Sequence, residues 1–241
     1  MEAVKLLSSA APENVDRLLQ INPDMFIVVR LFVDLSNRIM TPYEFVRDAV
    51  NDVAMYYAKG VRFFEVHNEP NLMQEGLGQS WQDGRGFATW FQTAVDLMKE
   101  QYPDALFGWP GLSPGGDVPG MRMSAGRFLN EASATVHAAD WIGIHCYFLT
   151  DSEMTHEHAG GFWKLYQEEY PGKLLLITEF SNPSIQVSKS AKALQYVDYY
   201  DWLRNQKPLA AAFCFISSAS VGFEHETWVG SDIAQIVGAR E

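Results

Sequence analysis

The chain has 241 residues, of which 47% are hydrophobic and 20% are charged, and its 18 glycines and 11 prolines are spread along it. This composition is that of a globular protein and excludes fibrous and disordered chains. Asp and Glu outnumber Lys and Arg by 30 to 18, which gives a formal net charge of −12. We therefore expect neither nucleic acid nor a membrane as a partner, because both need a basic or a long apolar surface.

Neither an export signal nor a disulfide is expected. The first residues, MEAVKLLSSAAP, are too short and too weakly apolar for a signal peptide. We expect a cytoplasmic protein, with secretion as the alternative if the natural chain begins further upstream. Cys146 and Cys214 lie in apolar runs that are not predicted to be neighbouring strands, too far apart for a disulfide. Both are interpreted as buried free thiols.

Short apolar runs alternate with amphipathic stretches along the whole chain. The runs bounded by turn residues are predicted to be seven strands, at 4–7, 26–32, 62–66, 106–109, 141–148, 174–180 and 210–216. The amphipathic stretches are predicted to be helices, at 13–20, 42–58, 85–101, 126–136, 161–170 and 189–205. The second helix has the clearest signals, since Thr41 is a good N-cap, Pro42 suits the first turn and Gly60 ends it.

The strand composition indicates a parallel sheet. Runs such as FIVVRLF and KLLLITEF are apolar on both faces, which is typical of parallel strands covered on both sides. No strand is followed by a glycine-rich phosphate-binding motif, and no linker or repeat divides the chain. We predict a single α/β domain over residues 1–241, of the (β/α) barrel type, with functional groups at the carboxyl ends of the strands.

Two glutamates are predicted to stand at such strand ends. The segment FFEVHNEPN runs from an apolar strand into Asn68 and Glu69, and Pro70 ends the strand because it has no backbone N–H to donate. Glu179 follows the apolar run LLLIT in the same way. Retaining glycoside hydrolysis needs two carboxylates on either side of one glycosidic bond, one as acid and then base and one as nucleophile. The pair therefore predicts a glycosidase.

With these residues in this order, the sequence resembles the clan A glycoside hydrolases, retaining enzymes built on a (β/α)8 barrel. The resemblance implies that Glu69 ends strand four as the acid/base and that Glu179 ends strand seven as the nucleophile. It also matches His145 and Tyr147 to the His-x-Tyr that the family often has on strand six, where the tyrosine hydroxyl bonds the nucleophile. Asn68 would then hold the 2-hydroxyl group of the sugar.

The same resemblance implies an incomplete barrel. If Glu69 ends strand four, the two strands before it are strands three and two, so the first βα unit is missing and seven strands remain. Open edges of such a barrel are a possible site of homodimer formation. Arg30 is a candidate for the arginine that supports the nucleophile in the family, and Lys5 is the alternative. We expect Glu65 to be paired with these cations inside the barrel.

Several aromatic and polar residues are candidates to line the sugar site. Trp81, Trp109 and Trp228 lie near predicted loops, where aromatic rings stack on sugars. Trp228 is also matched by the resemblance to a tryptophan after strand eight, and core packing is an equal alternative for Trp109. His225 and Glu226 follow the last strand, with a surface turn as the alternative.

We expect a retaining β-glycosidase that acts within a β-glucan or mannan chain, since the segment 71–86 is long, Gly-rich and contains Trp81. The expected partner is an oligo- or polysaccharide, and no cofactor or metal is implied, because the carboxylates supply both proton transfer and nucleophile. One alternative is a non-catalytic carbohydrate-binding or assembly protein on a degenerate barrel. Another is a metal-dependent barrel hydrolase that uses His67, His145 and the two glutamates.

Overall fold

The computed structural model describes residues 2–35, 38–218 and 221–239. The strands are β1 (Ala3–Leu7), β2 (Phe26–Leu31), β3 (Phe63–Val66), β4 (Leu106–Trp109), β5 (Trp141–Tyr147), β6 (Leu175–Ser181) and β7 (Leu209–Cys214). The helices are α1 (Glu13–Ile21), α2 (Pro42–Ala58), α3 (Gly84–Lys99), α4 (Ala125–Ala138), α5 (Trp163–Glu169), α6 (Lys189–Leu203) and α7 (Asp232–Gly238), with a short 3₁₀ helix η1 (Met73–Glu75). Each predicted strand and helix is confirmed with ends within two residues, whereas η1 and α7 were not predicted.

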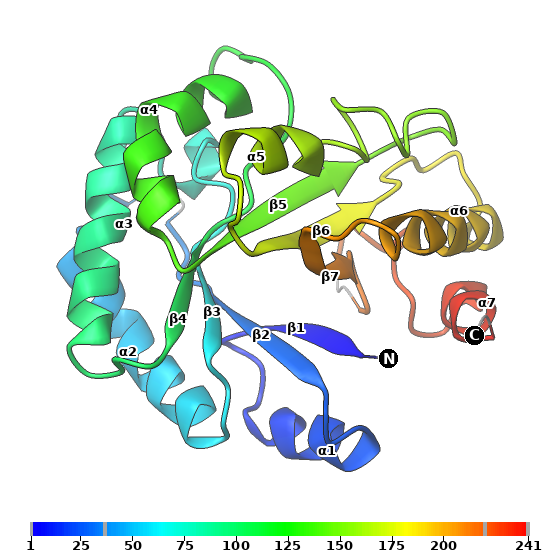
Figure 1. Cartoon of the computed structure of the whole chain (residues 1–241), viewed down its shortest axis with the longest axis horizontal. Helices are drawn as coiled ribbons and strands as arrows, with labels where there is room; N and C mark the ends of the chain where they lie inside the picture. Colours follow the sequence, from blue (N-terminus) through cyan, green and yellow to red (C-terminus); the bar gives the residue numbers. More distant parts are fainter. Residues whose placement is uncertain (1, 36–37, 219–220, 240–241) are drawn as a thin grey trace. The chain divides into compact units, whose positions relative to one another are not determined.

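The strands follow one another in the sheet in the order of the chain, β1-β2-β3-β4-β5-β6-β7 (Figure 1). The recorded pairings are parallel, and a helix lies between successive strands. Sequential parallel strands with intervening helices are the arrangement of the (β/α) barrel fold. The predicted fold class is confirmed, with seven strands in the part of the chain that the structure describes.

The chain forms two compact units, Met1–Gly143 and Ile144–Glu241, and the boundary between them falls inside β5. The first unit holds β1 to β4 with α1 to α4, and β4 pairs there with the beginning of β5. The second unit holds the rest of β5 with β6, β7 and α5 to α7. The single domain expected over residues 1–241 stays a prediction.

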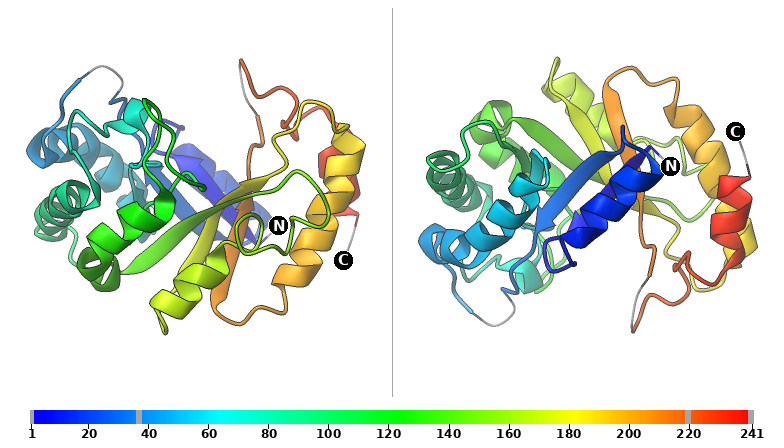
Figure 2. Two further views of the ribbon diagram at one scale, coloured as in Figure 1. Left: turned by 90° about the horizontal axis from the view of Figure 1, so that it is seen from above. Right: turned by 90° about the horizontal axis from the view of Figure 1, so that it is seen from below.

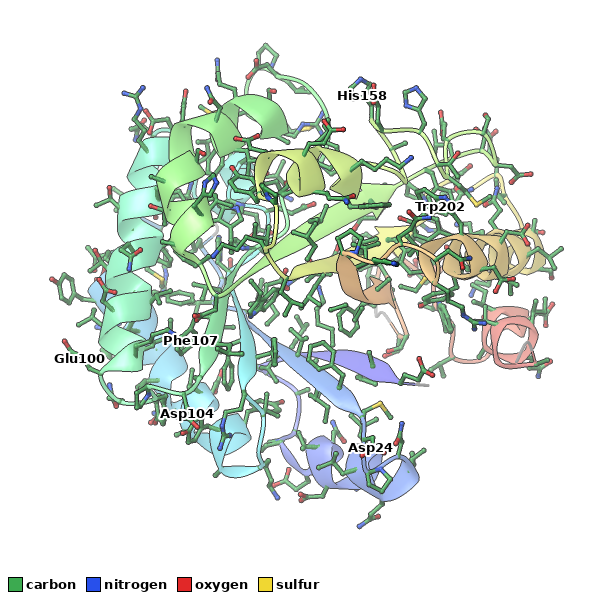
Figure 3. The ribbon with its side chains drawn as sticks, viewed as in Figure 1. Asp24, Glu100, Asp104, Phe107, His158 and Trp202 are labelled. Atoms are coloured by element: carbon green, nitrogen blue, oxygen red, sulfur yellow. The ribbon has the colours of Figure 1, made fainter. Side chains whose placement is uncertain are left out.

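In the first unit, the helices α2, α3 and α4 lie side by side along the strands (Figure 2). Phe107 of β4, labelled in Figure 3, is fully buried and stacks on Phe64 of β3 with 5.7 Å between the ring centroids. Helix α2 begins with a capping box between Thr41 and Glu44, as its sequence indicates. These contacts are ordinary apolar packing and helix capping.

In the second unit, α6 packs on β6 through aromatic rings. Phe180 of β6 lies 4.8 Å from the ring of Tyr199 and 5.6 Å from that of Tyr196, both on α6. Cys146 and Cys214 are free thiols, as predicted, although Cys214 is only half-buried. Burial raises the pKa of Cys146 to about 12. No helix within the described ranges has both the length and the apolar character needed to cross a membrane.

We predict that Gly108→Ala destabilises the protein. Gly108 lies in β4 directly under the ring of Trp141, and a Cβ atom added there would be 2.1 Å from a ring carbon. Forced overpacking of this kind costs about 1–3 kcal/mol of the free energy of unfolding. Urea unfolding followed by circular dichroism measures the change.

Gly116→Ala is the matched control, because its added Cβ has no heavy atom within 4 Å. Its free energy of unfolding should stay within about 0.5 kcal/mol of the wild-type value. Equal unfolding midpoints for the two variants would contradict the close packing of β4 against Trp141.

Candidate active site

The turn after β3 carries Glu69 on a strained backbone. His67 has φ of 74° and Glu69 has φ of 35°, both in the left-handed region that residues other than glycine rarely adopt. Such conformations cost on the order of 1–3 kcal/mol each and concentrate at functional sites. The turn is held by hydrogen bonds from the N–H of His67 to the carbonyl of Leu31 at 3.3 Å and from the N–H of Glu69 to that of Gly111 at 3.1 Å. The Glu69 side chain is half-buried.

His67 is fully buried behind this turn. Its Nε2 lies 2.8 Å from the carbonyl oxygen of Glu75, and its ring lies 5.6 Å from the ring of Trp81. Burial among aromatic rings disfavours the charged imidazolium and lowers the pKa of His67 from 6.5 to about 4. His67 is therefore a neutral side chain that ties the strand end to η1.

Asn68 follows His67 and reaches the same 3₁₀ helix. Its Nδ2 donates a hydrogen bond of 3.1 Å to Oε1 of Glu75. Its Oδ1 has no hydrogen-bond partner among the described residues, although Asn68 as a whole is only half-buried. The Oδ1 atom itself is shielded from solvent, so it is a buried acceptor that the described residues leave unsatisfied.

Glu65 lies on the same strand, four residues before Glu69, and is fully buried. Its Oε2 lies 2.8 Å from Nε of Arg30 on β2 and 3.3 Å from Nζ of Lys5 on β1. Its Oε1 accepts a 3.3 Å hydrogen bond from the N–H of Gly111. The expected pairing of Glu65 with both cations is confirmed, so in this unit the guanidinium of Arg30 neutralises an interior carboxylate.

Trp81 and Trp109 are both buried in this unit, with exposed fractions of 3% and 0%. The indole N–H of Trp81 donates to the carbonyl of Pro70 at 2.8 Å, next to Glu69. The Trp109 ring lies 5.0 Å from the ring of Phe87. Their contacts are those of packing side chains, and Trp81 in addition supports the turn that carries Glu69.

In the second unit, Glu179 is brought together with the two residues of the His-x-Tyr segment. Glu179 is third from the end of β6 and 6% exposed, while His145 and Tyr147 project from one face of β5. The Tyr147 hydroxyl donates a short hydrogen bond to Oε2 of Glu179. His145 Nδ1 lies 3.7 Å from the same oxygen. The carboxylate is thus held by a donor from the neighbouring strand.

A second carboxyl group, Glu226, lies near Glu179 in the same unit. Glu226 is 2% exposed and accepts a short hydrogen bond from the hydroxyl of Ser181, two residues after Glu179. Burial raises the pKa of Glu226, while Ser181 and the nearby cation of Lys192 lower it, and Glu179 adds a smaller upward shift. The sequence named Glu226 as a candidate to line the site, with a surface turn as the alternative, but its contact with Ser181 spans 45 positions and leaves no local signal.

Trp228 lies on the same loop as Glu226 and is half-buried. Its ring is nearly parallel to that of Tyr196 on α6, at an interplanar angle of 9° and a centroid distance of 6.2 Å. The backbone N–H of Trp228 donates to the carbonyl of Ser217 at 3.1 Å, which holds the loop after β7. One face of the indole is therefore occupied by a tyrosine of its own unit.

The histidines and acidic residues do not form a metal site in the part of the chain that is described, where no group of three or more His, Cys, Asp or Glu side chains could hold an ion. His158, which is exposed and labelled in Figure 3, lies 3.6 Å from the carboxylate of Glu157. His67, by contrast, is directed at a backbone carbonyl.

The chain is similar to solved structures of glucanases. It matches a GH128 (subgroup II) endo-β-1,3-glucanase from Sorangium cellulosum with a TM-score of 0.66 and 18% identity, over 89% of this chain and 80% of the other. A GH128 (subgroup I) endo-β-1,3-glucanase from Amycolatopsis mediterranei, in complex with laminarihexaose, matches with a TM-score of 0.62 and 15% identity over 98% and 97%. A curdlan-specific exo-β-1,3-glucanase of GH128 (subgroup III) from Blastomyces gilchristii, in complex with glucose, matches with a TM-score of 0.61 and 14% identity, over 97% of this chain and 96% of the other.

No protein-family model matches the sequence, and no curated protein does. At identities of 14–18%, the likeness to these structures establishes a shared fold. The barrel fold supports many activities, so the fold alone leaves the function to be argued from the site residues.

We predict that His67 makes the free energy of unfolding decrease as the pH is lowered. Because the pKa of His67 is lowered from 6.5 to about 4 in the folded state, the unfolded chain binds this proton more tightly. The free energy of unfolding is therefore unaffected by protonation of His67 above pH 6.5. Between pH 6.5 and pH 4 it decreases by about 1.4 kcal/mol for each pH unit. His67→Gln should remove this slope, as measured by urea unfolding at pH 7 and pH 5.

His158→Gln serves as the control, since His158 is exposed. It should keep the wild-type difference in stability between the two pH values. The same difference in His67→Gln as in wild type would show that His67 is not the group responsible.

Proposed function

We propose that this chain is a retaining glycoside hydrolase that cleaves β-1,3-linked glucan, with Glu69 as the acid/base and Glu179 as the nucleophile. The observation that carries the proposal is the carboxylate of Glu179 at the end of β6, with the hydroxyl of Tyr147 bonded to one of its oxygens. A nucleophilic carboxylate must be ionised and oriented, and a hydroxyl that donates to one of its oxygens favours the ionised form and fixes its orientation.

The turn after β3 supports the role of Glu69. A carboxyl group on a backbone with positive φ, anchored by the carbonyl of Gly111 and followed by Pro70, is held in one place relative to the strand end. A general acid needs such fixed placement, because proton transfer depends on geometry before it depends on pKa. Glu69 follows β3 and Glu179 lies near the carboxyl end of β6, and the carboxyl ends of parallel strands carry the active sites of barrel enzymes.

The proposed reaction has two displacements at the anomeric carbon. In the first, an oxygen of Glu179 bonds to the anomeric carbon, the glycosidic C–O bond breaks, and Glu69 gives its proton to the departing oxygen. In the second, Glu69 takes a proton from water, whose oxygen displaces Glu179 and releases the sugar with its original configuration. The mechanism requires the two carboxyl groups to come within about 5–5.5 Å of each other.

The likeness to β-1,3-glucanases supports the choice of substrate. The similar structures named above include endo- and exo-acting enzymes, two of them bound to laminarihexaose or glucose. We propose internal cleavage, in line with the long segment between Asn71 and Gly86. The half-buried Trp228, the amide of Asn68 and the ring of His145 are the proposed sugar contacts.

We predict that Glu179→Ala abolishes hydrolysis of laminarihexaose. Loss of the nucleophile should lower kcat by on the order of 10⁴-fold or more, because the covalent intermediate cannot form. Azide should restore cleavage of an aryl β-glucoside and yield the α-glycosyl azide, which nuclear magnetic resonance identifies.

Glu69→Ala is the matched comparison, since azide should there yield the β-glycosyl azide. The same azide anomer from both variants would contradict the division of roles. Binding of laminarihexaose without turnover by the folded wild-type chain would instead favour a carbohydrate-binding protein.

We also predict that Tyr147→Phe lowers kcat/KM while leaving the fold intact. The change deletes only the hydroxyl that donates to Glu179, and a hydrogen bond to a charged group is worth about 1.5–3 kcal/mol, or about 10- to 100-fold in rate. Tyr43→Phe, on the exposed part of α2, is the control and should be unchanged. Equal kcat/KM for the two variants would show that the Tyr147 hydroxyl does not assist Glu179.

A further inference from the structure

The loops that follow β3 and β4 are joined by the fully buried side chain of Asn71. Its Nδ2 donates to the carbonyl oxygens of Ser113 at 2.9 Å and of Met123 at 3.0 Å. Its Oδ1 accepts a hydrogen bond of 2.9 Å from the N–H of Ser113. These three hydrogen bonds all end on the loop between β4 and α4, so a change of this side chain acts on that contact.

The amide of Asn71 takes the place of a backbone peptide group. It donates to the carbonyl and accepts from the N–H of the same residue, Ser113, as one strand residue does with its partner. Pro70, directly before it, has no N–H to offer. The N–H of Glu69 donates to the carbonyl of Gly111, so Glu69 and Asn71 meet the loop after β4 at matching positions. The side chain of Asn71 therefore continues the pairing of the two loops past the proline.

A tight turn connects this anchor to Glu69. The carbonyl of Glu69 accepts a 2.9 Å hydrogen bond from the N–H of Leu72, which closes a turn with Pro70 and Asn71 at its centre. The proline ring fixes φ at about −65°, which removes one of the rotations between Asn71 and Glu69. The φ of 35° at Glu69 is strained and persists only if its surroundings oppose relaxation. Gly111 opposes it on one side of Glu69 and Asn71 on the other.

We propose that Asn71 is a positioning residue that holds the carboxyl group of Glu69 where it can protonate the departing oxygen. The inference rests on the proposed function, because it takes Glu69 as the acid/base. Asn71 is fully buried, so it acts through the turn and not by touching the sugar. Loss of its amide therefore impairs proton transfer by Glu69 more than attack by Glu179.

The test compares phenyl and dinitrophenyl β-laminaribiosides, which differ only in the leaving group. Phenol departs poorly without a proton from the acid, whereas dinitrophenol departs as a stable anion and needs none. In Asn71→Ala we expect kcat/KM to fall at least about tenfold on the phenyl substrate, because a misplaced acid costs up to about 10²-fold. On the dinitrophenyl substrate it should fall less than about threefold, since that step needs no acid.

Glu69→Ala gives the reference for this difference. It should lower kcat/KM on the phenyl substrate by on the order of 10²-fold or more and leave the dinitrophenyl substrate nearly unchanged. Asn71→Ala should then have no further effect in the Glu69→Ala background. Equal losses on both substrates in Glu69→Ala would reject the proposed function. The difference in Glu69→Ala without one in Asn71→Ala would reject only the role of Asn71.

Asn182→Ala is the matched control on the side of the nucleophile. Asn182 lies shortly after Glu179 and is also fully buried, and its Nδ2 donates to the carbonyl of Leu149 at 2.9 Å and to Gln195 at 2.8 Å. Both substrates need the nucleophile, so this variant should change kcat/KM on both by the same factor. Equal losses on both in Asn71→Ala, or no loss on either, would overturn the proposal and leave Asn71 with a structural role.

Asn71→Ser is the second variant if Asn71→Ala does not fold. Its hydroxyl keeps a polar group among the buried carbonyls, but the side chain is too short to pair with both groups of Ser113. Circular dichroism confirms the fold at the assay temperature. The same preference for the dinitrophenyl substrate is expected, and its absence in the folded variant would overturn the proposal.

A second measurement does not depend on turnover. In Asn71→Ala or Asn71→Ser, native-state hydrogen exchange should become at least about tenfold faster at the N–H groups of Glu69 and Leu72, while the N–H of His67, bonded to β2, changes less. Unchanged exchange at Glu69 and Leu72 would overturn the proposal even in an active enzyme. Faster exchange at both, in a protein whose folded wild type hydrolyses neither substrate, would retain the anchor and reject the proposed function.

Discussion

The buried carboxylate of Glu65 is the interaction on which the first unit depends. A fully buried carboxylate is costly unless charge and hydrogen bonds compensate it, and its partners come from three other segments: Arg30 on β2, Lys5 on β1 and the N–H of Gly111 after β4. Each partner is in reach only when the strands keep their register, in which Arg30 lies opposite Glu65. The carbonyl of the same Gly111 accepts a hydrogen bond from the N–H of Glu69. The buried carboxylate of Glu65 is therefore linked through Gly111 to the proposed acid/base.

In the second unit, hydroxyl groups donate to both of the carboxylates described above. Glu179 is bonded by the hydroxyl of Tyr147, and Glu226 by that of Ser181. A hydroxyl that donates to a carboxylate oxygen stabilises the ionised form and limits how the group can rotate. Lys192, which is buried, directs its Nζ at the carbonyl of His225 at 3.1 Å. The charge of Lys192 therefore acts on Glu226 electrostatically from a distance, while its Nζ is bonded to the carbonyl.

The strand order and the positions of Glu69 and Glu179 could be predicted because they depend on local signals. Apolar runs bounded by turn residues define the strands, although β3 ends at Val66 and not next to Pro70, because the turn with positive φ at His67 and Glu69 comes between them. The 3₁₀ helix that carries Glu75 could not be predicted in this way, since three residues show no periodicity. The burial of Trp81 also escaped the sequence, because a ring that stacks on a sugar and a ring that packs on His67 look alike until the neighbours are known.

The strained turn explains why so many separate elements converge on the segment after β3. Positive φ at His67 and at Glu69 persists only if the surroundings oppose relaxation of both. The opposing contacts come from Leu31 on β2 and from Gly111 after β4. They come also from the backbone of η1 and from the indole of Trp81, which holds the carbonyl of Pro70. These anchors are spread over the sequence, so the geometry of Glu69 is a property of the folded unit and is lost when the unit opens.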